Sequence, residues 1–160
     1  MIHAQRADLY NPQHAKAVVD LLNGYALDPM GGNEPLANFA RENLVNELRK
    51  RPTAHIVLGF VDDEPAGLVN CFEGFSTFAC KPLLNIHDVA VAPEHRGKGL
   101  SSVMLDKVEE IARELGCCKL TLEVLEGNTL AQSAYKRMGF AGYELDPAMG
   151  RAMFWQKKLS

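Results

Sequence analysis

The hydrophobic and polar positions along the chain follow two periods, which predicts a mixture of strands and helices. Apolar residues recur in steps of four, four, three and four from Leu100 to Leu115, which keeps them on one face of a helix. The preceding run, 86–91, is too short for a helix and contains two valines, so it predicts a strand that ends at Pro93. Strand, glycine-bearing turn and helix therefore follow one another in the middle of the chain.

The same patterns predict the other elements. Strands are expected at 2–7, 55–61, 66–72, 84–92, 119–125, from Phe140 onward and at 152–159, and helices after Asn11, from Glu34 to Pro52, from Leu100 and at 129–138. Turn residues at 62–65 join the second and third strands as an antiparallel hairpin. The strand at 119–125 should lie parallel to the one before the glycine turn, because a strand–helix–strand unit crosses over. The expected fold class is mixed α/β (α+β), with a mostly antiparallel sheet of about seven strands.

Length, charge and cysteine usage narrow the class of protein. A chain of 160 residues suits a single domain, 1–160. The net charge is −3, the basic residues are scattered and no aromatic stacking platform accompanies them, so we expect no nucleic-acid partner. No apolar run approaches membrane-spanning length and the first residues do not resemble a signal peptide, so we expect no membrane and a cytoplasmic location. The four cysteines lack C-x-x-C spacing, so neither a metal site nor a disulfide framework is expected.

The turn between the central strand and helix has the chemistry of an anion site. Gly97 and Gly99 allow close backbone approach, while Arg96 and Lys98 add positive charge at the start of the helix. These features predict a pyrophosphate cradle; the alternative is an ordinary glycine-rich loop with solvated basic residues. A Walker loop does not fit, because Lys98 is followed by glycine, and a dinucleotide fingerprint does not fit, because Ser102 stands at its third glycine.

Two motifs in register carry a resemblance to a known family. The first reads Val89-Ala90-Val91-x-Pro93-x-x-Arg96-Gly97-Lys98-Gly99, and the second reads Asn128-x-x-Ala131-x-x-x-Tyr135-x-x-x-Gly139-Phe140. In combination and in this order they resemble the GNAT superfamily of acetyl-CoA-dependent N-acetyltransferases. The resemblance implies a single domain with four helices, a sheet splayed between its fourth and fifth strands, and acetyl-CoA as co-substrate without a metal.

The resemblance also implies a set of residues that contact the cofactor. The backbone of the fourth strand would pair with the pantetheine amides, the turn and helix start would hold the phosphates, and Asn128 would lie near the thiol end of the CoA arm. The implied residues are Val89, Ala90, Val91, Arg96, Gly97, Lys98, Gly99, Leu100, Ser101, Asn128, Ala131 and Tyr135. Ser101 departs from the family pattern, which prefers glycine or alanine there. The alternative for Asn128 is a helix N-cap, and both roles are compatible.

Catalysis in this family implies an acid and a base near the thioester. Tyr135 matches the tyrosine that can protonate the leaving thiolate; its alternative is a buried aromatic on a short helix. Deprotonation of the attacking amine points to Asp88, then His87, with Glu123 as a third option. Adjacent strand residues face opposite sides, so at most one of His87 and Asp88 would point at the substrate unless a bulge re-aims them. A Cys71 nucleophile is conceivable, but no base motif is paired with it, and a buried apolar role fits better.

The acceptor is expected to be a small-molecule primary amine that attacks directly in a ternary complex. Side chains that could line an apolar, mildly acidic pocket are Phe72, Glu73, Phe75, Phe78, Tyr25, Asp28 and Glu34, although they could equally be core residues and solvated charges. Ser76-Thr77-Phe78, Lys81-Pro82 and Asp88 resemble the diamine and polyamine branch of the family. The alternatives are a protein or peptide N-acetyltransferase and a non-catalytic acyl-CoA-binding module, and a homodimer is compatible with the sequence.

Overall fold

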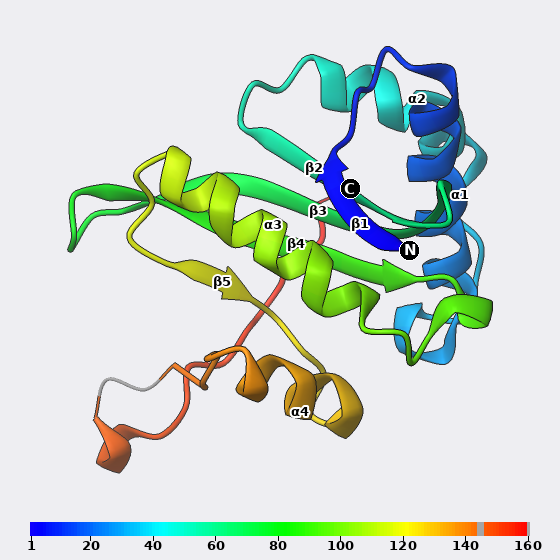
Figure 1. The fold of residues 1–160 in the computed structure, drawn as a ribbon. Helices are drawn as coiled ribbons and strands as arrows, with labels where there is room; N and C mark the ends of the chain where they lie inside the picture. Colours follow the sequence, from blue (N-terminus) through cyan, green and yellow to red (C-terminus); the bar gives the residue numbers. More distant parts are fainter. Residues whose placement is uncertain (144–145, 160) are drawn as a thin grey trace. The chain divides into compact units, whose positions relative to one another are not determined.

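The computed structural model describes residues 1–143 and 146–159 (Figure 1). Its contacts divide the chain into two units, Met1–Leu125 and Glu126–Ser160. The first contains β1 (Ile2–Arg6), α1 (Pro12–Leu27), η1 (Pro29–Gly31), α2 (Asn38–Arg49), β2 (Ala54–Val61), β3 (Glu64–Ser76), β4 (Lys81–Val91), η2 (Pro93–His95), α3 (Leu100–Glu114) and β5 (Leu120–Leu122). The second contains α4 (Thr129–Arg137) and the short η3 (Pro147–Met149).

The first unit is built on one open sheet of five strands in the order β1-β2-β3-β4-β5. Neighbouring strands from β1 to β4 are antiparallel, and β5 is parallel to β4. The parallel pairing confirms the predicted strand–helix–strand unit, in which α3 makes the crossover. The fold class, a mixed α/β arrangement with four helices, is therefore confirmed.

Helices cover both faces of the sheet (Figure 1). Ala17, Val18 and Leu48 of α1 and α2 form a buried cluster with β2, and with Leu68 and Ala90 of β3 and β4. The opposite face carries α3, whose buried stripe is Leu100, Met104, Leu105, Val108, Ile111 and Ala112. This stripe agrees with the predicted helical periodicity and fixes where the glycine turn at the start of α3 lies.

Local signals explain why several elements begin and end where they do. Asn11 caps α1 by accepting hydrogen bonds from the N–H groups of Gln13 and His14, and Pro12 occupies the first helical position. The β2–β3 hairpin turns at Asp62 and Asp63, which adopt left-handed φ values of 48° and 66° as a tight hairpin turn requires. These elements were predictable because a few residues determine each of them.

The prediction of two further strands after α4 was wrong. Residues 140–143 and 152–159 contain no strand, so the described sheet has five strands rather than about seven; 144–145, which the first expected strand would include, lie outside the described residues. The β-favouring residues Phe154 and Trp155 are 74% and 80% exposed. A strand requires a hydrogen-bonded neighbour as well as β-propensity. The described backbone bond between the two expected strands, from Ala152 N to Tyr143 O at 3.5 Å, does not build a ladder.

The boundaries of the other elements differ from the predicted ones by only a few residues. β5 covers only Leu120–Leu122 of the expected 119–125, α1 continues past Gly24 to Leu27, and α2 begins at Asn38 rather than Glu34. β4 begins earlier than expected, because Lys81 and Pro82 pair with Ser76 and Phe75 at the end of a long β3–β4 hairpin.

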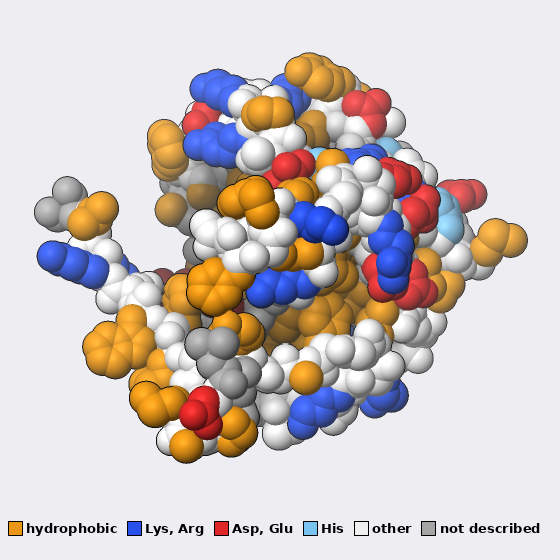
Figure 2. Space-filling model, turned by 90° about the vertical axis from the view of Figure 1, so that its left-hand side faces the viewer, with side chains coloured by type: hydrophobic (Ala, Val, Ile, Leu, Met, Phe, Trp, Pro, Cys, Tyr) orange, Lys and Arg blue, Asp and Glu red, His pale blue; other side chains and the backbone are white. Residues whose placement is uncertain are grey.

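One face of the molecule shows hydrophobic side chains lying among basic and acidic ones (Figure 2). On the β3–β4 hairpin, Phe75 and Phe78 are 59% and 94% exposed.

No helix among residues 1–143 and 146–159 is long and apolar enough to cross a membrane.

Close approach of α3 to the sheet leads to a prediction about stability. Met104 is fully buried, and a Cβ built on Gly67 would lie 2.7 Å from its Cε atom. Met104→Ala should lower the free energy of unfolding by about 2–5 kcal/mol through the cavity it leaves, and Gly67→Ala by about 1–3 kcal/mol through overpacking. The double variant should lose less than the sum, because the new methyl group fills part of the cavity; urea unfolding of all three variants measures this. Additive losses would contradict the proposed packing.

Candidate functional site

A β-bulge interrupts the pairing of β3 and β4 in the middle of the sheet. Asn70 pairs with Asp88 and Cys71 pairs with Ile86, so His87 is an extra residue without a partner on β3. A bulge of this kind bends the strand and changes the direction of the side chains beside it.

The bulge brings the side chains of His87 and Asp88 to the same face of the sheet. Asn70 and Phe72 are two residues apart on β3 and therefore share a face. The Asn70 Nδ2 donates to Asp88 Oδ2 at 3.0 Å, and the Phe72 ring meets the His87 ring edge to face, with 4.8 Å between centroids. Because Phe72 packs against the core cluster under α1 and α2, His87 and Asp88 both point to that side. In an unbulged strand they would have faced opposite sides.

Asn70 is a residue that the sequence reasoning missed. It is only 3% exposed, and its Oδ1 accepts no hydrogen bond from any described residue. Its amide group holds the Asp88 carboxylate in place, because Nδ2 is the donor that Asp88 accepts from. The signal was present in the sequence: a single asparagine interrupts the apolar run of β3, where a polar side chain needs a partner.

Two side chains at the end of α1 add to this group. Burial raises the pKa of the Tyr25 phenol, and the carboxylates of Asp88 and Asp28 raise it further. Tyr25 therefore lies in the field of two negative charges, one from β4 and one from the segment that follows α1. A cation placed there would be stabilised by the same field.

The turn between β4 and α3 has the backbone that its glycines predicted. Gly97 and Gly99 adopt left-handed φ values of 79° and 81°, and a Cβ added to either would meet no atom within 4 Å. Gly99 is the N-cap of α3 and has no side chain with which to cap the helix. The first turn of α3 therefore has no side-chain cap from Gly99, and an anion is a ligand that a helix N-terminus of this kind can bind.

The two basic side chains of the turn have different partners. Arg96 Nη2 donates to Asp28 Oδ2 at 3.1 Å, and its Nε donates to the Val91 carbonyl at 3.3 Å. Lys98 Nζ lies 3.1 Å from His95 Nδ1. The hydrogen bond from the Met30 N–H to Asp28, together with that from Arg96, lowers the pKa of the Asp28 carboxyl. Arg96 thus ties the turn to the segment after α1.

β4 and β5 pair over a short stretch only. The register runs from Leu84 opposite Leu120 to Ile86 opposite Leu122, and from His87 onward β4 has no partner on β5. β5 therefore pairs with no backbone group of Val89, Ala90 or Val91, and the Val91 carbonyl accepts from Arg96 Nε. The pairing ends where the bulge begins.

α4 belongs to the second unit, Glu126–Ser160. Asn128 Oδ1 accepts a hydrogen bond from the Ala131 N–H at 3.2 Å, so the N-cap interpretation is confirmed. The Tyr135 ring lies 5.9 Å from that of Phe140, between centroids, in an edge-to-face contact. Within this unit the second motif forms one helix and its cap; the functions expected of Asn128, Ala131 and Tyr135 stay predictions.

The cysteine alternative loses support. Cys71 is 1% exposed, and burial, with a further contribution from Asp88, raises the pKa of its thiol to about 12. A thiol of this kind is almost fully protonated near neutral pH and is a poor nucleophile. Among residues 1–143 and 146–159, no three His, Cys, Asp or Glu side chains form a group that could hold a metal ion.

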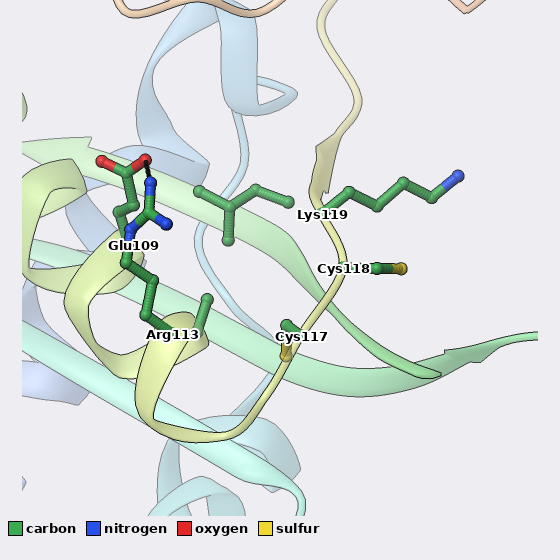
Figure 3. Close-up of a pocket in the computed structure, with 7 residues that line it drawn as sticks. Glu109, Arg113, Cys117, Cys118 and Lys119 are labelled. Atoms are coloured by element: carbon green, nitrogen blue, oxygen red, sulfur yellow. Dashed lines mark hydrogen bonds and ion pairs between the residues drawn. The ribbon is translucent and has the colours of Figure 1, made fainter. Parts of the chain in front are cut away.

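A small pocket lies at the other end of α3 (Figure 3). It has a volume of about 120 Å³ and is lined by Glu109, Ala112, Arg113, Cys117, Cys118, Lys119 and Leu120. The Glu109–Arg113 ion pair, 3.1 Å long, lies along its wall. Small-molecule sites usually have about 300–1,000 Å³. A helix length of about 20 Å separates this pocket from the glycine turn, so it is not part of the same site.

Comparisons with known proteins find acetyltransferases among the proteins that this chain resembles. Streptothricin acetyltransferase of Streptomyces lavendulae is 45% identical over 78 residues, which cover 49% of this chain and 41% of that protein. A thialysine N-epsilon-acetyltransferase of Caenorhabditis elegans is 26% identical over 81% of this chain and 78% of that protein. A crystal structure described as a probable acetyltransferase superposes with a TM-score of 0.77 at 21% identity, covering 100% of this chain and 98% of the other, and shows the same fold.

The chain thus spans less than half the length of the first of these relatives. The family model for the acetyltransferase (GNAT) family matches residues 18–140, well over half of the chain and including both motifs as far as Phe140. On this match, the chain belongs to the acetyltransferase (GNAT) family.

Proposed function

We propose that the protein transfers an acetyl group from acetyl-CoA to a primary amine of a small molecule, by direct attack in a ternary complex. The observation that carries the proposal is the bulge at His87, which turns two candidate bases to one face of β4 beside the stretch where β4 leaves β5. The glycine turn follows directly on the same strand. Cofactor binding and proton transfer would thus be organised by one strand.

The residues of the first unit fit a CoA-like ligand. Open space beside Gly97 and Gly99 leaves room for phosphate oxygens, and Arg96, Lys98 and the start of α3 at Leu100 and Ser101 supply positive potential. The backbone at Val89–Val91 offers groups that an amide-bearing arm could pair with. When bound, acetyl-CoA supplies the activated acyl group. Ser101 is half-buried, and its hydroxyl could add a hydrogen bond to a phosphate.

The acceptor would be a cationic amine. Asp88 and Asp28 both raise the pKa of Tyr25, so a protonated amine near this phenol would meet two carboxylates. The names of the relatives agree, since streptothricin and thialysine are small molecules and the second is acetylated on its ε nitrogen. These side chains would select for positive charge and hold the amine before it loses a proton.

The proton balance defines the roles of the residues. An alkylamine of pKa about 10.4 requires about 4.6 kcal/mol to be neutral at pH 7. Asp88, directly or through a water, would take the amine proton, with His87 as the other candidate. The neutral amine would then attack the carbonyl carbon to form the C–N bond, and its nitrogen would lose a second proton to water as the C–S bond breaks. Tyr135 would give its proton to the departing sulfur and regain one from solvent. Asn128 and Ala131 would lie beside the same arm of the cofactor.

We also propose that both units belong to one N-acetyltransferase domain, 1–160, that works in the cytoplasm and is able to form a homodimer. The family match crosses the boundary between the units at Leu125, because it runs from residue 18 to 140. A boundary inside the matched segment supports a single functional domain.

An acceptor panel tests the function. Acetyl-CoA would be incubated with the protein and 1,4-diaminobutane, spermidine, lysine, an aminoglycoside, or peptides bearing a free N-terminus or a lysine, and release of CoA thiol would be followed. We expect amine-dependent thiol release with one or more of the small cationic amines, confirmed by mass spectrometry of the acetylated product. Release with peptides alone would favour a protein acetyltransferase. CoA binding without release on any amine would indicate a non-catalytic acyl-CoA-binding module.

The two candidate bases can be separated by matched substitutions. Asp88→Asn keeps an oxygen that can accept from Asn70 Nδ2 and removes the charge, so kcat should fall about 10²- to 10⁴-fold if Asp88 takes the proton. His87→Gln should then lower kcat only a few-fold. The reverse order would assign the base to His87. Far-ultraviolet circular dichroism and CoA affinity of each variant check that the fold and cofactor site are retained.

The acid can be tested in the second unit. Tyr135→Phe removes only the hydroxyl and keeps the ring that contacts Phe140, so the fold should be preserved. If Tyr135 protonates the thiolate, kcat should fall about 10²-fold while CoA affinity changes little. An unchanged kcat would assign Tyr135 a packing role.

A further inference from the structure

One ion pair joins the two halves of the proposed site. Asp28, in the segment after α1, and Arg96, in the glycine turn, are 68 residues apart in sequence, and their Oδ2 and Nη2 atoms lie 3.1 Å apart. The Asp28 carboxylate, like that of Asp88, raises the pKa of Tyr25 beyond the effect of burial. Arg96 carries the guanidinium that we expect to bind a phosphate. A change at either ligand site would therefore be felt at the other.

The side chains of Asp28 and Arg96 differ in how strongly the surrounding residues restrain them. Asp28 Oδ1 accepts a hydrogen bond from the Met30 N–H at 3.0 Å, which caps η1, and its own carbonyl accepts from the Gly31 N–H at 2.8 Å. The Asp28 side chain is 25% exposed, whereas that of Arg96 is 53% exposed and extends from a turn with two glycines. Among the described residues, Arg96 has one other side-chain hydrogen bond, from Nε to the Val91 carbonyl at 3.3 Å. If the pair opens, the guanidinium has only this long bond to give up, so Arg96 is the partner expected to move, and Asp28 stays in place with Oδ2 unpaired.

The second cation of the turn does not share this arrangement. The N-terminal amine lowers the pKa of the Asp62 carboxyl through a hydrogen bond and its charge, with smaller contributions from Lys98 and His95. Lys98 Nζ lies 3.1 Å from His95 Nδ1. Of the two cations of the turn, Arg96 is therefore the one that forms an ion pair with a carboxylate of the group around Tyr25.

We infer that Asp28 changes partners during the reaction cycle: it holds Arg96 while the cofactor is absent, and it binds the ammonium group of the acceptor once a diphosphate has taken Arg96. This inference rests on the proposed function. A diphosphate carries more charge than one carboxylate and binds a guanidinium through two hydrogen bonds, so it can displace Asp28. The backbone N–H of Asp28 donates to the Tyr25 carbonyl at 3.0 Å, so the released carboxylate stays beside the end of α1. It then acts on the Tyr25 phenol together with Asp88, which Asn70 keeps in place.

The exchange predicts coupling between the two ligands. Cofactor binding must break the Asp28–Arg96 pair, and the acceptor gains a carboxylate only after the pair has broken. Each ligand should therefore raise the affinity for the other by the same factor. Asp28 is a specificity-determining residue in this scheme, since an uncharged acceptor could not use the released carboxylate.

Asp28→Asn tests the exchange because it keeps the cap and removes the charge. The side-chain oxygen can still accept from the Met30 N–H, so η1 should be retained. CoA should bind about two- to fivefold more tightly, the range expected when an exposed ion pair no longer competes. Binding of 1,4-diaminobutane to the CoA-loaded protein should weaken about tenfold, as expected for a lost charge-assisted hydrogen bond. Isothermal titration calorimetry at low and at high salt measures both affinities.

Asp62→Asn is the matched control. It removes a carboxylate that pairs with the N-terminal amine and changes the net charge by the same amount, and Asp62 is not among the carboxylates that act on Tyr25. The affinity for 1,4-diaminobutane should stay as in the wild type, and CoA should still raise it. Opposite changes in the two affinities should appear in Asp28→Asn alone.

Three results would overturn the exchange: CoA binding to Asp28→Asn that is unchanged or weaker, amine binding that is unchanged, or equal amine affinity of the wild type with and without CoA. Each would leave the acetyltransferase proposal standing if the wild type still transfers acetyl groups. Wild-type protein that binds no CoA would instead contradict the proposed function itself.

Discussion

The extra residue at His87 is the constraint on which the candidate site depends. A strand with regular pairing would separate His87 from Asp88 by the thickness of the sheet, and only one could face α1. With the bulge, both side chains face α1, where Phe72 and Asn70 contact them. The same residue marks the position beyond which β4 no longer pairs with β5. One inserted residue thus coincides with the change from a strand paired on both sides to a strand that pairs with β3 but no longer with β5.

The second organising feature is the way opposite charges are distributed around the glycine turn. A turn that must bind an anion needs positive charge, but exposed cations without partners would repel one another. In this chain Arg96 pairs with Asp28, whereas Lys98 contacts His95, and Asp62 pairs with the N-terminal amine. One of the two cations of the turn is therefore already engaged by a carboxylate. The affinity of the turn for an anion depends on how easily Asp28 gives way, and not only on the number of basic residues.

Much of the fold could be predicted because its signals are local. The cap at Asn11, the hairpin turn at Asp62 and Asp63, and the apolar period of α3 each depend on residues within a few positions of one another. The strands expected from Phe140 and at 152–159 were wrong because their β-favouring residues say nothing about a pairing partner. A strand forms only where two segments pair, and the sequence of one segment does not show which other segment it will pair with.

The candidate site was predictable to the same degree. Arg96, Gly97 and Gly99 were singled out from the composition of one short turn, which left both an anion cradle and an ordinary glycine-rich loop open; only the family resemblance pointed to a cofactor there. The bulge at His87 was left open, because it depends on the register between β3 and β4. The Asp28–Arg96 pair could not be predicted, because 68 residues separate the partners and only the tertiary fold brings them together. Asn70 could have been found, as a lone polar residue in an apolar strand.

The burial of Cys71 protects its thiol from oxidation. Oxidation of cysteine follows the thiolate form and its exposure, and Cys71 offers neither, with a pKa of about 12 and 1% exposure. Cys80 and Cys118 are exposed, the first on the β3–β4 hairpin and the second beside the small pocket at the far end of α3. Peroxide would modify these two first. The strand behind Asp88 would stay chemically intact, so redox damage would begin away from the candidate bases.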